Sequence, residues 1–111
     1  MGRFKFNLLL LLLASVDSFR IAVVGVHKAP ARLAAWRGST HGWNVTRIGV
    51  RNKSDAFGYK NEFDHVVIDR TAVTPRGEAL LQHAYPHATH HYISSKEEAI
   101  DTMDGLFALR L

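Results

Sequence analysis

The chain has 111 residues, a formal net charge of +4 and no cysteine; 47% of its residues are hydrophobic and 22% are charged. This is the composition of one globular domain, and it excludes a disordered protein, a disulfide framework, thiolate catalysis and cysteine-ligated metal centres. The positive balance favours anionic partners, although a charge of this size also serves solubility alone.

Residues 1–18 form an apolar segment that differs from the rest of the chain. Two cations precede six consecutive leucines, residues 8–13. A positive start before a short apolar run is typical of a secretory signal, and Asn44 and Asn52 begin sequons that secretion would expose to glycosylation. The run is too short to span a bilayer, so we expect no stable membrane span. We expect a cytoplasmic protein in which this segment is a structural element, with secretion after removal of a short signal as the alternative.

Four segments are predicted to be strands: residues 20–26, 44–50, 65–69 and 89–93. The first and third contain nearly uninterrupted apolar runs, which are typical of parallel strands covered on both faces. The second mixes apolar and polar residues on both faces, which indicates an edge strand.

Helices are predicted between these strands. Pro30 suits the first turn of a helix that Gly38 is expected to end. Thr74 followed by Pro75 reads as an N-cap and a first-turn proline, and that helix should stop near Pro86.

The last helix has the clearest sequence signal. Ser95 with Glu98 three residues later forms a capping box. Ile100, Met103 and Phe107 follow the spacing of a stripe that faces the core.

Strands that alternate with helices predict an α/β domain over residues 19–111, with a mostly parallel four-stranded sheet and right-handed crossovers. We expect a Rossmann-like three-layer arrangement with strand order 2-1-3-4. The switch between the first and third strands would bring residues 25–28 beside residues 69–74, where open α/β sheets bind ligands.

A valine-rich strand that ends in glycine is followed later by an Asp-x-Val-Val strand, and then by a valine and a hydroxyl residue. The residues are Val23, Val24 and Gly25, then Asp64, Val66 and Val67, then Val73 and Thr74. In this pattern, residues 20–103 resemble a small, uncharacterised family of Rossmann-like bacterial domains. Val26 stands where that family has a second glycine, and Pro75 stands where it has histidine. The resemblance implies the fold and no activity.

Cations follow the C-terminal end of every predicted strand. These ends share one edge of a parallel sheet, and the starts of the following helices favour anions there. We therefore predict a module that binds a phosphate-bearing ligand, either a nucleotide or a nucleic acid. No P-loop and no G-x-G-x-x-G sequence is present, and no cofactor is predicted. The predicted ligand-binding residues are His27, Lys28, Arg51, Lys53, Arg70, Thr71, Thr74, Arg76 and Lys96.

Two other classes of function stay open. A small hydrolase would use Asp69 as a base with His27 as its partner; no motif decides whether the chain is an enzyme. A structural or interaction protein of a virus or mobile element would dock through the leucine run or a sheet edge, and a homo-oligomer would fit that function.

Four histidines gather near the last strand: His83, His87, His90 and His91. The first two have the spacing of a helical metal pair, but a proline between them breaks the helix. The last two are neighbours on a strand and point to opposite faces. No metal site is predicted.

Overall fold

The structure is a computed structural model that describes residues 20–49 and 63–110. Four strands form one sheet in the order β2-β1-β3-β4, and every neighbouring pair is parallel. The strands are β1 (Arg20–Val24), β2 (Asn44–Ile48), β3 (His65–Asp69) and β4 (Thr89–Ile93). The predicted fold class and strand order are therefore confirmed. Residues 1–18, with the leucine run, lie outside the described residues.

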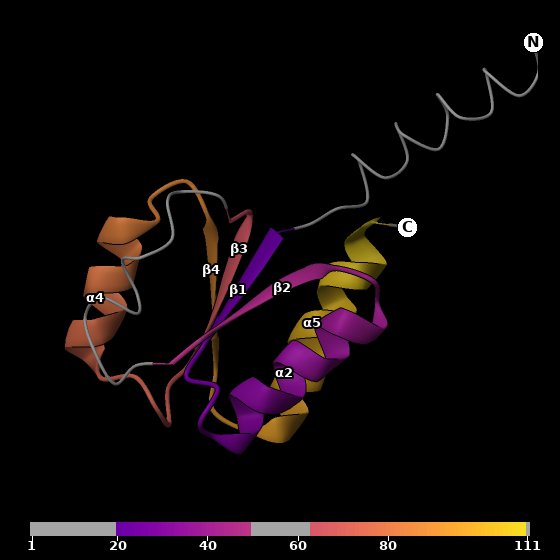
Figure 1. The fold of residues 1–111 in the computed structure, drawn as a ribbon, viewed down its shortest axis with the longest axis horizontal. Helices are drawn as coiled ribbons and strands as arrows, with labels where there is room; N and C mark the ends of the chain where they lie inside the picture. Colours follow the sequence, from indigo (N-terminus) through magenta and orange to yellow (C-terminus); the bar gives the residue numbers. More distant parts are fainter. Residues whose placement is uncertain (1–19, 50–62, 111) are drawn as a thin grey trace, which may run out of the picture.

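Three helices cover the sheet as a three-layer sandwich (Figure 1). The helices α2 (Ala29–Thr40) and α5 (Lys96–Arg110) pack together on one face, and α4 (Pro75–Ala84) covers the other. No helix in the described part of the chain combines the length and apolar character needed to cross a membrane.

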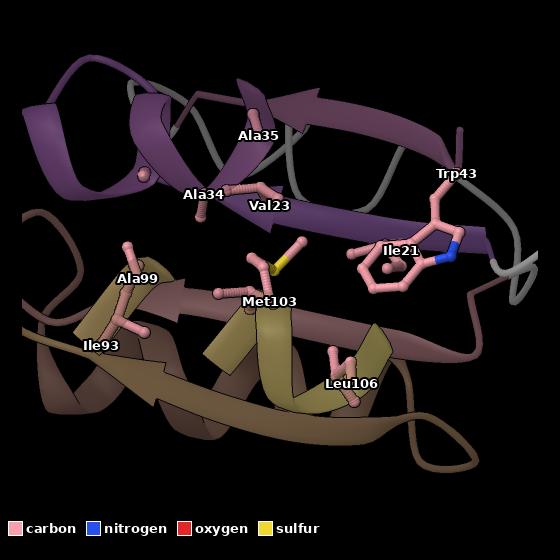
Figure 2. Close-up of a cluster of buried hydrophobic side chains, with 11 residues drawn as sticks. Ile21, Val23, Ala34, Ala35, Trp43, Ile93, Ala99, Met103 and Leu106 are labelled. Carbon is pink, nitrogen blue, oxygen red and sulfur yellow. The ribbon is translucent and has the colours of Figure 1, made fainter. Parts of the chain in front are cut away.

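The strict alternation of side chains along β1 and β3 divides the core into two clusters. Ile21, Val23 and Val67 face α2 and α5, while Ala22 and Val66 face α4. Figure 2 shows the first cluster, with Met103 near its centre and the Trp43 ring beside Ile21. Both central strands are thus covered on both faces, as their apolar sequences predicted.

The prediction that Gly38 ends the first helix is wrong. The helix continues to Thr40, and the buried Gly38 lies where α2 crosses α5: a Cβ there would be 2.8 Å from Met103 Cε. The residue that terminates the helix is instead Gly42, which follows the C-cap His41 and has a φ of +81°. The amide of Gly42 donates to Ser39 O at 3.0 Å and that of Trp43 to Gly38 O at 3.2 Å, which together make a Schellman motif.

The other helix starts match their predicted caps. Thr74 Oγ1 accepts from the Gly77 amide at 3.1 Å. In α5, Ser95 Oγ accepts from the Glu98 amide at 3.2 Å, and the Glu98 carboxylate accepts from the Ser94 amide at 3.1 Å. The capping box is therefore present, with its returning bond one residue earlier than usual.

The predicted core stripe of α5 is only partly correct. Met103 is fully buried, but Phe107 is 37% exposed, and Ala99 and Leu106 take the core positions instead. The cause is that α5 packs against α2 as well as the sheet, so the flank with Phe107 turns toward α2. Its ring stacks on His41 with a centroid separation of 4.2 Å.

Candidate functional site

The predicted switch point between β1 and β3 exists, and its two loops touch. Gly25 ends β1 with a φ of +99°, a conformation that L side chains rarely adopt. A Cβ at this position would be 2.8 Å from Ala72 Cβ and 3.2 Å from Asp69 Cβ. The loop that leads into α2 therefore lies directly against the loop that leads into α4, and this crevice is closely packed.

Asp69 is the buried charged residue of the described core, with an exposed fraction of 0%. Its Oδ2 accepts from the Ala31 amide at 3.0 Å. Its Oδ1 accepts from the Thr71 amide at 2.9 Å and from Thr71 Oγ1 at 2.6 Å. Since Lys28 at the N-cap of α2 provides no side-chain bond, the helix receives its cap from a strand 38 residues away.

The carboxylate of Asp69 thus stands where the start of α2 would attract a phosphate. A bound anion at that helix end would have to displace it or lie beside its negative charge. The described structure therefore offers the start of α2 to an anion at its outer surface, through Lys28 and not through the Ala31 amide that Asp69 satisfies.

The predicted pair of Asp69 and His27 is not assembled. Asp69 ends β3 and His27 lies in the loop after the neighbouring β1, but His27 is exposed. Within residues 20–49 and 63–110, no hydrogen bond joins its ring to Asp69, whose oxygens are occupied as described above. The geometry gives Asp69 a structural role in holding α2 against β3.

The loop after β3 and the first turn of α4 together hold four of the predicted residues, in different ways. Arg70 Nε donates to Glu78 Oε1 at 3.0 Å, and its guanidinium lies 4.3 Å from the centroid of the Tyr92 ring. Thr71 and Thr74 are used as the Asp69 partner and the α4 cap. Arg76 extends into solvent.

Three cations stand at the starts of helices: Lys28 before α2, Arg76 in the first turn of α4, and Lys96 at the first position of α5. All three are exposed, and none has an acidic partner among the described residues. A helix start carries partial positive charge, so a cation there is unfavourable on its own. Folding alone gives no reason for this repeated placement.

The C-terminal edge of the sheet, where the strands end, is less positive than the sequence suggested. Acidic residues of the first turns, Glu78 in α4 and Glu97 and Glu98 in α5, accompany the cations. The surplus of cations therefore lies around the starts of α2 and α4. The predicted residues Arg51 and Lys53 lie outside the described residues.

Sequence reasoning missed an ion-pair cluster between α2 and α5. Arg37 binds Asp104 with two hydrogen bonds of 2.7 Å and 3.1 Å, and His41 Nε2 lies 3.0 Å from Asp104 Oδ1. The hydrogen bonds from Arg37 and then from His41 lower the pKa of Asp104 to about 2. The hydrogen bond and charge of Asp104 raise the pKa of Arg37. The spacing of these residues along the chain gave no signal, because their contact requires the packing of the two helices.

A second missed contact joins His65 of β3 to His91 of β4, with 3.0 Å between Nδ1 and Nε2. Burial lowers the pKa of His65, which the charge of Asp64 opposes. Burial, followed by the nearby His65 and His90, lowers the pKa of His91. On the other face of the sheet, His90 Nε2 is buried without a hydrogen-bond partner. The described residues contain no cluster of three or more His, Cys, Asp or Glu that could hold a metal ion.

Comparison with known proteins adds no relative: no family, no curated protein and no solved structure matches the chain. The four-stranded parallel α/β arrangement that the family resemblance implied is present. It is consistent with a Rossmann-like domain, and the functional reading depends on the geometry alone.

Proposed function

We propose that this domain binds a phosphate-bearing ligand, a nucleotide or a nucleic acid, at the C-terminal edge of its sheet. The observation that carries the proposal is the exposed, unpaired cation at each helix start in the described structure: Lys28, Arg76 and Lys96. Each one stands where it opposes the helix dipole, and a bound phosphate would relieve that opposition.

The contacts would be made on the surface. Gly25 and Asp69 fill the crevice at the switch point, so a mononucleotide has no apolar slot there for its base. An extended chain with repeated phosphates can instead reach separate cations along the edge. We therefore favour a nucleic acid over a free nucleotide, with Lys28 and Arg76 as the principal contacts and His27, Arg70 and Lys96 beside them.

The test is binding of a fluorescent single-stranded oligonucleotide, followed by anisotropy as salt is raised. Each phosphate contact to a single strand contributes about 0.7 to the slope of log affinity against log salt, or about threefold between 50 and 200 mM. The double variant Lys28→Gln, Arg76→Gln should weaken binding and reduce this slope by about 1.4. A labelled ATP analogue, measured in parallel, distinguishes a nucleotide from a nucleic acid.

Arg20→Gln is the matched control. Arg20 is also an exposed arginine, but it is the first residue of β1 and so lies at the end of the sheet where the strands begin, away from the proposed site. There its Nε lies 3.9 Å from Asp64 Oδ2. It should leave affinity and slope unchanged. Absence of binding at low salt, or an equal loss in the control, would refute the proposed site.

We also propose membership of the uncharacterised Rossmann-like family that the sequence resembles. The two departures have structural roles in this fold: Val26 packs against the α2 and α5 cluster, and Pro75 begins α4.

A further inference from the structure

Among residues 20–49 and 63–110, nothing pairs with the outer edge of β4, and this edge lacks the usual protection. In the described part of the chain no strand lies beyond β4. Edge strands commonly carry a lysine, another charge or a proline that discourages pairing with a second chain. The other edge has the exposed Arg47 in β2. The β4 sequence, Thr-His-His-Tyr-Ile, has no charged residue other than histidine and no proline.

The backbone bonds of β4 show which of its groups point outward. The Thr89 amide donates to Asp64 O at 3.0 Å, and Ile93 O accepts from the Arg70 amide at 2.8 Å. In a parallel ladder, alternate residues direct both backbone groups to the same neighbour. The backbone N–H and C=O groups of Thr89, His91 and Ile93 therefore point toward β3. Those of His90 and Tyr92 point toward the open edge.

Within β4 the open edge consists of those two residues, and the amides that flank them are bonded within the chain. On one side the Ala88 amide donates to Tyr85 O at 3.3 Å, and on the other the Ser94 amide donates to Glu98 Oε2 at 3.1 Å. The β4 strand therefore presents two donors and two acceptors at this edge. In antiparallel pairing with an identical edge, His90 of one copy lies opposite Tyr92 of the other, and all four groups of each copy are satisfied.

We propose that the chain forms a twofold dimer in which β4 pairs antiparallel with β4 of a second copy, with the axis at His91. The two sheets join into one of eight strands, through four backbone hydrogen bonds between His90 and Tyr92 of opposite copies. A closed twofold contact of this kind uses the same surface on both copies.

Two side chains beside the edge fit this arrangement. Leu109 on α5 is 84% exposed. It lies five residues after Asp104, or about 140° around the helix, and Asp104 faces α2. Leu109 is therefore on the flank away from α2, toward the β4 side that α5 covers. The pairing also places Tyr92 of the second copy opposite His90, whose buried Nε2 has no partner in the described chain.

The absence of cysteine in the native sequence permits a direct test. Two copies of residue 91 would form the non-hydrogen-bonded pair at the axis, where Cα atoms are about 4.5 Å apart, within the range of a disulfide. The full chain at tens of micromolar should sediment at twice its mass of 12.4 kDa. His91→Cys should convert to a covalent dimer under mild oxidation. Thr46→Cys, at the corresponding central position of β2, should stay monomeric on a denaturing gel.

A second pair of variants tests the same edge without cysteine. Tyr92→Pro removes an outward amide and should give a monomer, while Arg47→Pro, which changes the β2 edge in the same way, should leave the dimer intact. Circular dichroism checks that each variant folds. If Tyr92→Pro does not fold, the two cysteine variants alone test the dimer. A monomeric native chain, cross-linking through Thr46→Cys, or a native dimer that neither cysteine traps would each overturn the proposal.

Discussion

Replacing Asp69 should be among the most damaging single changes in the described domain. Its carboxylate has an exposed fraction of 0% and accepts three hydrogen bonds, from the amides of Ala31 and Thr71 and from Thr71 Oγ1. Asp69→Ala removes all three and leaves the Ala31 amide buried without an acceptor.

The size of the effect follows from those bonds. A hydrogen bond to a charged group contributes about 1.5–3 kcal/mol, and such losses within one network are not additive. We expect Asp69→Ala to lower the free energy of unfolding by about 3–5 kcal/mol, comparable to breaking a buried ion pair. Asp69→Asn keeps one acceptor oxygen and should cost about 2–3 kcal/mol, while Thr71→Val removes a single bond and should cost about 1–2 kcal/mol.

The assay is urea unfolding followed by circular dichroism, with the free energy extrapolated to water. The graded series keeps the prediction testable if Asp69→Ala does not fold, since domains of this size are stable by only about 5–15 kcal/mol. The expected order of damage is Thr71→Val, then Asp69→Asn, then Asp69→Ala. A loss below about 1 kcal/mol for Asp69→Asn would show that the capping bond to α2 contributes little.

Two further changes test the packing and the histidine contact. Gly38→Ala should destabilise the domain by about 1–3 kcal/mol through overpacking. Gly105→Ala, on the exposed side of α5, should stabilise it by about 0.5–1 kcal/mol. If urea unfolding showed stability changes of the same sign for both variants, the close crossing of α2 and α5 would be contradicted. Folding lowers the pKa values of His65 and His91. Their contribution to the free energy of unfolding is therefore complete above the pKa of an unfolded histidine, about 6.5. It is lost as pH falls through the lower pKa values of the folded protein, because the unfolded chain then binds more protons. The melting temperature should therefore drop between about pH 7.5 and 5, less so in His91→Gln, while His87→Gln at an exposed site should retain the full drop.

The sequence predicted the architecture because its signals are local. The apolar runs of β1 and β3, the Thr74 cap and the Ser95 capping box each depend on a few consecutive residues, and all are present. Their order then restricts the topology, since parallel strands need right-handed crossovers. The observed strand order 2-1-3-4 satisfies that restriction.

The failures concern contacts between distant segments. Glycine serves either to end a helix or to let two helices approach, and only the position of Met103 shows that Gly38 does the second. Likewise, nothing near Lys28 indicates that Asp69 will cap α2. The candidate site shares this difficulty, because sequence locates cations along an edge but cannot tell that the crevice between them is filled.

The two halves of the core would be completed at different times during synthesis. The buried members of the cluster under α4 end at Tyr85, but those of the other cluster end at Leu106 on the last helix. A nascent chain that has emerged as far as β4 can bury one side of its sheet, while the other side is covered by α2 alone and still lacks Ala99, Met103 and Leu106 of α5. That unfinished side is the surface on which a ribosome-bound intermediate would attract chaperones or aggregate.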